Sequence, residues 1–165
     1  MRGKINWSHL FLVMNLFVLL SIATSVTAQS FPDFKIRTTN GKVVSSGQIS
    51  INKPTIIIVF SPDCGHCQVL IDGIFKKINH FKNTHIIMAT FVQPKDIITF
   101  EKKYQTAKYT NVTVGTDEPV FFLQKYYQLT NTPFTVLYDK NRKLIASYKS
   151  EHITADLIKR LEKLH

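Results

Sequence analysis

An unbroken apolar strand followed closely by two cysteines limits the folds open to this chain. The segment Thr55–Phe60 reads TIIIVF, and a run so rich in β-branched residues suits a central strand that is covered on both faces. Cys64 and Cys67 come next, and helical spacing of apolar residues extends from Cys67 to Phe81. These apolar residues are Val69, Leu70, Ile74, Ile78 and Phe81. The pattern predicts a buried strand that leads into an amphipathic helix, with the cysteine pair at the junction.

The rest of the chain alternates between strand-like and helix-like segments. Strands are predicted at Phe34–Thr38, His85–Val92, Val112–Val114, Phe134–Tyr138 and Leu144–Tyr148. Helices are predicted from Pro94 to Tyr104, from Asp117 to Tyr127, and from a Thr154 cap to the carboxyl terminus. We therefore predict a single α/β domain over residues 29–165, with a sheet and helices on both of its faces.

The first 28 residues have a different character from the rest. Arg2 and Lys4 precede the apolar segment Leu10–Ala23, and small residues follow at Val26–Ala28. This order is typical of a secretory signal peptide. An uncleaved membrane anchor is the alternative, although the apolar segment is shorter than the roughly 20 residues that a spanning helix needs. We expect an exported protein, periplasmic or secreted, whose cysteines work where disulfides persist.

The chain is basic, with 21 Lys and Arg against 11 Asp and Glu and a net charge of +10. Such a charge favours anionic surfaces in general. The basic residues are spread along the whole chain and form no single block, which indicates a solvated basic surface. We therefore predict no nucleic-acid partner, and membrane attachment only if the N-terminal segment is uncleaved.

The chemistry of the chain is concentrated in Cys64-Gly65-His66-Cys67. A cysteine at the start of a helix meets unpaired backbone N–H groups and the positive end of the helix dipole, and both favour the thiolate. Two intervening residues let the second sulfur reach the first. His66 offers a cation that stabilises the thiolate of the reduced protein, which would make the oxidised form a stronger oxidant.

Each of these residues also has a non-catalytic interpretation. A C-x-x-C pair is half of a zinc site, but zinc takes about four ligands. No second pair exists, and His80, His85 and His152 have no ligand-like spacing. A purely structural disulfide would close a very small loop and remove little entropy from the unfolded chain. His66 is equally compatible with a solvated surface histidine. The strand-then-helix context favours a redox dithiol, and no metal or cofactor is predicted.

From Phe31 to the carboxyl terminus, the chain resembles thioredoxin-fold proteins of the exported TlpA/ResA-like group. The resemblance lies in Phe31–Phe34 with Asn40-Gly41-Lys42, in Lys53-Pro54 and the segment up to Cys67, and in Leu129–Asp139. It implies a central mixed sheet with an N-terminal β-hairpin extension. It also implies that the Thr132–Pro133 bond is cis, faces the dithiol and offers the Thr132 backbone to a bound peptide.

Three residues depart from the pattern of this group. Asp63 replaces the aromatic residue that often precedes the first cysteine, and its carboxylate would oppose the thiolate unless it points to solvent. Ile58 stands where thioredoxins commonly bury an acid, and Leu70 stands where some exported relatives carry a glutamate. The proton acceptor for Cys67 is therefore not identified by the sequence.

We predict a monomeric thiol-disulfide oxidoreductase that acts on client proteins and is reset by a redox partner. Cys64 exchanges with the client, Cys67 resolves the mixed disulfide, and Thr132 with Pro133 shapes the substrate groove. One alternative is a peroxide-reducing member of the superfamily, whose usual Pro-x-x-x-Thr/Ser-x-x-Cys pattern is not met at Pro62. A second is a copper-handling thioredoxin-like protein, which typically uses a wider cysteine spacing.

Overall fold

The computed structural model describes residues 30–164. The predicted signal peptide or anchor at residues 1–28 lies outside the described residues. Between residues 30 and 164, no helix has the length and apolar character needed to cross a membrane.

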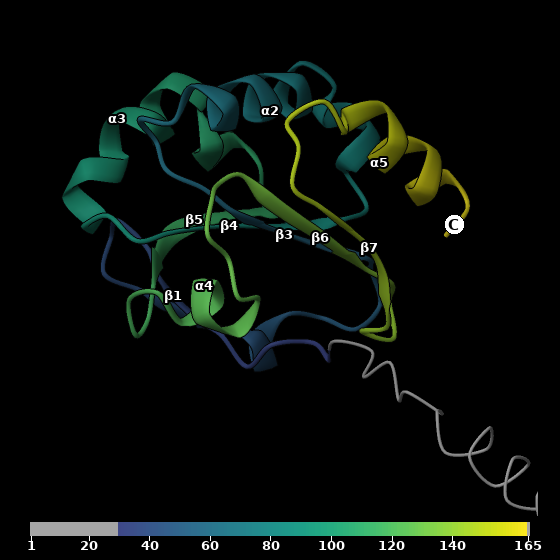
Figure 1. The fold of residues 1–165 in the computed structure, drawn as a ribbon, viewed down its shortest axis with the longest axis horizontal. Coiled ribbons are helices and arrows are strands. Elements are labelled where there is room, and N and C mark those ends of the chain that lie inside the picture. The colour runs from purple at the N-terminus through teal and green to yellow at the C-terminus, as the bar shows by residue number, and fades with distance from the viewer. Residues whose placement is uncertain (1–29, 165) are drawn as a thin grey trace, which may run out of the picture.

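In this part of the chain, seven strands form one sheet in the order β2-β1-β5-β4-β3-β6-β7 (Figure 1). The strands are β1 (Lys35–Arg37), β2 (Val43–Ser45), β3 (Thr55–Val59), β4 (His85–Thr90), β5 (Val112–Asp117), β6 (Phe134–Tyr138) and β7 (Leu144–Tyr148). Strands β3, β4 and β5 run parallel, and the other neighbours are antiparallel. The sheet is therefore mixed, and β1 with β2 forms the hairpin that the resemblance implies.

Helices cover both faces of this sheet, as predicted. They are α2 (Gly65–Lys76), α3 (Pro94–Tyr104), α4 (Phe122–Tyr126) and α5 (Thr154–Glu162), with 3₁₀ turns at Ser46–Gln48, Ile78–Phe81 and Thr106–Lys108. Figure 1 shows α2, α3 and α5 on one face and α4 on the other. Alternate residues of β3 supply the two cores, Ile56 and Ile58 on the α2 side and Ile57 and Val59 on the α4 side.

The helix after the cysteines begins earlier and ends sooner than its apolar spacing predicts. It starts at Gly65, so Cys64 is its N-cap, because the sulfur and the carbonyl of Cys64 accept the first helical N–H groups. It ends at Lys76, because the N–H of Lys77 donates a hydrogen bond to the carbonyl of Ile74. The last predicted turn, Ile78–Phe81, is a 3₁₀ turn.

The predicted helix Asp117–Tyr127 is wrong over its first half. Asp117 is the last residue of β5 and pairs with Ile36 of β1, and this pairing keeps the backbone extended. Its buried carboxylate accepts the N–H of Leu123 at 2.6 Å, so the acid supports α4 from the neighbouring strand. Pro119 has no N–H to donate, and α4 itself spans only Phe122–Tyr126.

The predicted Thr154 cap is also wrong, because Ile153 is the N-cap of α5 and Thr154 is its first helical residue. Thr154 instead packs against α2 at Gly73. A Cβ atom added to Gly73 would lie 2.6 Å from the Thr154 hydroxyl oxygen. The absence of a side chain at Gly73 is what lets α5 approach α2 this closely.

Gly115 allows a second close approach, between the N-terminal hairpin and the rest of the sheet. It lies in β5 beside β1, where Arg37 pairs with Thr116. A Cβ atom at Gly115 would overlap the backbone carbonyl of Arg37 and lie 2.7 Å from Cγ2 of Ile36. Because a strand backbone cannot move aside as a long side chain can, any larger residue there must push β1 away from β5.

We predict that Gly115→Ala lowers the free energy of unfolding by about 1–3 kcal/mol, the usual cost of overpacking a filled site. Gly47→Ala is the matched control, since a Cβ atom there meets only the Ser45 hydroxyl at 3.9 Å. Denaturant unfolding of the two variants and the parent protein measures the difference. Equal unfolding midpoints for Gly115→Ala and the parent would contradict the prediction.

Candidate active site

Cys64 lies where β3 has ended and α2 begins. Its Sγ accepts the backbone N–H of Cys67 at 3.3 Å, and its carbonyl accepts the N–H of Gln68 at 3.0 Å. The sulfur therefore occupies the position that a capping side-chain oxygen takes in other helices. A negative charge on this sulfur meets the positive end of the helix dipole.

These contacts favour the thiolate of Cys64. Partial burial acts to raise its pKa, but hydrogen bonds from the side chain and backbone of Cys67, from the side chain of Thr132 and from the backbone of His66 outweigh burial. The net result is a pKa below the ordinary thiol value of 9.0. Since the thiolate is the reactive form of cysteine, Cys64 is the better nucleophile of the pair.

Cys67 has the opposite environment. Its side chain is fully buried and packs in the same core as Ile58 and Leu70, the two apolar residues that replace familiar proton acceptors. Burial, followed by its interaction with Cys64, raises the pKa of Cys67 to about 11. One sulfur of the pair is thus accessible and readily ionised, and the other is enclosed and held as a thiol.

A loop distant in sequence completes the surroundings of Cys64. The Thr132–Pro133 peptide bond is cis, as the resemblance implies. The carbonyl oxygen of Thr132 accepts the S–H of Cys64 at 3.7 Å. Pro133 is buried and directly precedes β6, so the loop is fixed to the sheet. The structure therefore brings three of the predicted site residues, Cys64, Thr132 and Pro133, to one place.

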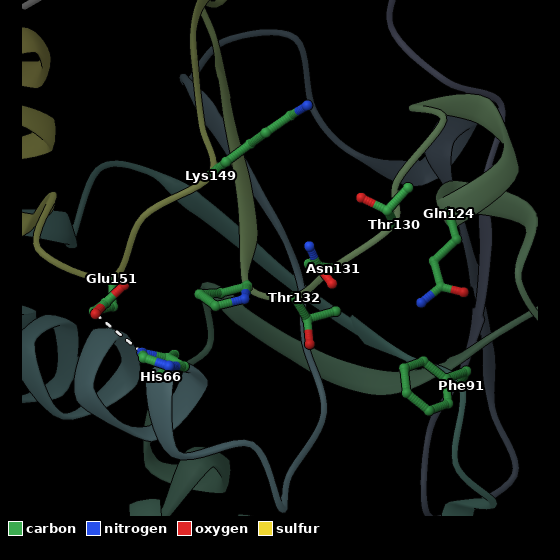
Figure 2. Close-up of a pocket in the computed structure, with 9 residues that line it drawn as sticks. His66, Phe91, Gln124, Thr130, Asn131, Thr132, Lys149 and Glu151 are labelled. Carbon is green, nitrogen blue, oxygen red and sulfur yellow. Dashed lines mark hydrogen bonds and ion pairs between the residues drawn. The ribbon is translucent and has the colours of Figure 1, made fainter.

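The side chain of His66 is 73% exposed and bonds to a partner that the sequence does not indicate. Its Nδ1 lies 3.0 Å from Oε1 of Glu151, which follows β7 (Figure 2). His152 Nε2 lies 3.6 Å from the same oxygen. The backbone of Glu151 and the contact with His66 lower the pKa of the Glu151 carboxyl group. No sequence motif links Glu151 to the cysteines; only the path of β7 brings it near.

His66 and Glu151, together with Thr132 and Pro133, line a groove of about 600 Å³. Figure 2 shows Thr132 between Phe91 on one side and His66 with Glu151 on the other. The complete lining is His66, Phe91, Gln124, Thr130, Asn131, Thr132, Pro133, Lys149 and Glu151. An extended polypeptide laid across Thr132 would therefore meet an aromatic side chain at one end and ionisable groups at the other.

Asp63, which the sequence places beside the nucleophile, is exposed to solvent. The groups that shift the pKa of Cys64 are those of Cys67, Thr132 and His66, together with burial. The structure thus satisfies the condition under which Asp63 leaves the thiolate unopposed. Among residues 30–164, no three His, Cys, Asp or Glu side chains gather as ligands for one metal ion.

Comparison with known proteins places the chain in a family. The model of the AhpC/TSA family matches residues 27–160, which is most of the sequence. The chain belongs to the AhpC/TSA family. A search of curated proteins gives no match.

Solved structures of other proteins show the same fold at low identity. The peroxiredoxin-like protein from Aquifex aeolicus has a TM-score of 0.66 and 14% identity, over 84% of this chain and 86% of that one. The exposed lipoprotein thioredoxin Etrx1 from Streptococcus pneumoniae has a TM-score of 0.61 and 18% identity, over 81% and 100%. The dsbF protein of MTB has a TM-score of 0.65 and 15% identity, over 86% and 100%.

We predict that iodoacetamide alkylates the reduced protein at Cys64 alone. The rate should rise with pH and reach half its maximum below pH 9.0, because the pKa of Cys64 is lowered. Cys67 should react only after unfolding, because it is buried and its pKa is about 11. Mass spectrometry of quenched samples identifies the labelled residue.

Asp63→Asn is the control for this pH profile. Because the Asp63 side chain is exposed, screening by solvent should leave the half-maximal pH of Cys64 alkylation unchanged in this variant. A clearly lower half-maximal pH would mean that the carboxylate acts on the sulfur, as the sequence alone suggests.

Proposed function

We propose that this protein is a thiol-disulfide oxidoreductase that exchanges disulfides with client proteins through Cys64 and Cys67. The observation that carries the proposal is the unequal state of the two thiols. Cys64 is accessible and its pKa is lowered, whereas Cys67 is buried with a pKa of about 11. A structural disulfide does not require two thiols of different accessibility and pKa. An exchange reaction that starts at one defined sulfur does require this difference.

In the oxidising direction, a client thiolate attacks Sγ of Cys64 in the Cys64–Cys67 disulfide. A bond forms between the client sulfur and Cys64, and Cys67 leaves as a thiolate that takes up a proton. A second client thiolate then attacks the client sulfur of this mixed disulfide and displaces the Cys64 thiolate. Two electrons pass from the client to the protein, and a thiol-disulfide partner restores the disulfide. The reducing direction reverses these steps and begins with attack by the Cys64 thiolate.

The other predicted site residues have supporting roles in this proposal. Thr132 and Pro133 form the edge against which a client backbone lies, because the Thr132 carbonyl already bonds to the Cys64 thiol. The backbone of His66 helps to lower the pKa of Cys64, and the contact of its ring with Glu151 holds the side chain at the rim of the groove. His66 therefore adjusts the balance between the dithiol and the disulfide.

We place the reaction outside the cytoplasm, with the protein acting as a monomer. The support is the composition of residues 1–28, which have the charged start, apolar middle and small-residue end of a signal peptide. A C-x-x-C pair that must alternate between dithiol and disulfide fits a compartment in which disulfides persist.

We predict that Cys67→Ser captures client proteins as stable mixed disulfides on Cys64, because the resolving thiol is missing. Cys64→Ser should capture almost none, since Cys67 is fully buried. Non-reducing electrophoresis of each purified variant with a reduced, unfolded test protein and a mild oxidant measures the capture. Equal capture by both variants, or capture by neither, would contradict the assigned roles.

We predict that the reduction potential of the Cys64/Cys67 pair is above that of thioredoxin, about −270 mV. The hydrogen bonds that lower the pKa of Cys64 stabilise the thiolate of the dithiol form, and this stabilisation makes the disulfide more oxidising. Equilibration with glutathione buffers, followed by alkylation of free thiols, gives the value. A potential at or below that of thioredoxin would favour a reductase.

Peroxide reduction is the second candidate, and the match to the AhpC/TSA family is the observation that favours it. The Cys64 thiolate would attack a peroxide oxygen, release water or an alcohol, and become a sulfenic acid. Cys67 would then displace water and form the disulfide. Two rates of the reduced protein separate the two functions: its oxidation by hydrogen peroxide and its disulfide exchange with an oxidised client protein. Only a peroxidase should react much faster with peroxide than with the client.

A further inference from the structure

Two phenylalanine rings meet at the end of the groove opposite His66. Phe91, which follows β4, lines the groove, and its ring stacks on Phe121 with centroids 5.3 Å apart and planes at 27°. Phe121 remains 42% exposed and its neighbour Val120 is 41% exposed. These two residues form a consecutive pair of large apolar side chains on the surface, next to the residues that surround the reactive sulfur.

The backbone of Phe121 is in an unfavourable conformation. Its φ of 68° and ψ of 14° are left-handed, and a bulky aromatic residue rarely adopts these angles. Hydrogen bonds on both sides hold the turn: Phe122 N–H bonds to the Pro119 carbonyl and Lys125 N–H to the Phe121 carbonyl, each at 3.0 Å. Strained residues that surrounding structure keeps in place cluster at functional sites.

The end of β5 anchors the backbone of the two segments that carry these rings. The Thr116 hydroxyl donates to the carbonyl of Val92, which follows Phe91, at 2.5 Å. The next residue, Asp117, accepts the N–H of Leu123, which follows the Phe121 turn, at 2.6 Å. Neighbouring strand residues point to opposite faces of the sheet, so one strand end holds the two loops together from both sides. The backbone segments on which the stacked pair stands are therefore tied to the sheet.

We propose that Phe91 and Phe121 form a specificity-determining contact for an aromatic side chain of the client. The occupant is an extended client segment whose aromatic residue lies two positions from the exchanging cysteine. Residues two apart in an extended chain point the same way, so a segment with its cysteine at Cys64 presents that side chain to the same wall of the groove. This inference rests on the proposed function, because it needs the client to bind across Thr132.

The test compares two synthetic peptides with a single cysteine activated as a thiopyridyl mixed disulfide. One carries Phe two residues from the cysteine, and the other carries Ser at the same position. Each peptide is made in two versions, with this residue on the amino side or on the carboxyl side of the cysteine. In the Cys67→Ser protein, the Cys64 thiolate attacks the peptide sulfur, forms the mixed disulfide and releases thiopyridone, whose absorbance gives the rate. Aromatic contacts make the Phe peptide about 2-fold to 10-fold faster.

Two further variants, in the same background, make the test specific. Phe121→Gly removes the exposed ring but keeps the turn, because glycine adopts the left-handed conformation freely. This variant should react with both peptides at the rate that the Ser peptide shows with the Cys67→Ser protein that keeps Phe121. Ile98→Ala removes an equally exposed apolar side chain, 42% accessible, that lines a separate cavity beside α3. It should keep the full preference.

Two outcomes would overturn the inference: equal rates for the two peptides on the parent protein, or an unchanged preference in Phe121→Gly. Free cysteine activated with the same leaving group separates this failure from failure of the proposed function. If activated cysteine reacts at Cys64 but the peptides show no preference, only the aromatic contact is wrong. If neither the amino acid nor the peptides react, the proposed exchange chemistry is wrong as well.

Discussion

The register between β3 and β6 is the constraint on which the site depends. Val59 at the end of β3 pairs with Phe134 at the start of β6, because the two strands are antiparallel. The residues just beyond that pair, Cys64 after β3 and Pro133 before β6, are therefore brought to the same edge of the sheet. A slip of one residue in this register would turn the buried side chains of β6 toward the opposite face and displace Thr132 from Cys64.

The other loops that line the groove also lie at this edge of the sheet, where β3 ends and β6 begins. Strands β3, β4 and β5 are parallel, so Phe91 after β4 and Phe121 after β5 emerge at the same edge of the sheet as Cys64. Strand β7 is antiparallel to β6, so it runs in the direction of β3, and its exit delivers Glu151. Binding sites of open α/β sheets form outside the carboxyl ends of strands for this reason. In this AhpC/TSA family chain, residues far apart in sequence meet because their strands end together.

The sequence predicts what local chemistry determines and fails where distant pairing decides. The strands Phe134–Tyr138 and Leu144–Tyr148 are found where apolar periodicity places them, and the cysteine pair is where the motif predicts it. The first half of the predicted Asp117–Tyr127 helix is wrong because pairing with β1 overrides the preference of acids for helix starts. Glu151 could not be found from the sequence, since its contact with His66 depends on where β7 ends.

The spacing of the two cysteines links their opposite properties. The N–H that stabilises a negative charge on Cys64 belongs to Cys67 itself, and the charge on Cys64 in turn helps to raise the pKa of Cys67. Only one thiolate is therefore favoured at a time. When Cys64 is bound to a client in a mixed disulfide, that charge is gone and one of the causes that raise the pKa of Cys67 is removed. Burial beside Ile58 and Leu70 remains. In the proposed mechanism, formation of the mixed disulfide is thus itself the event that makes Cys67 easier to ionise, and resolution follows capture.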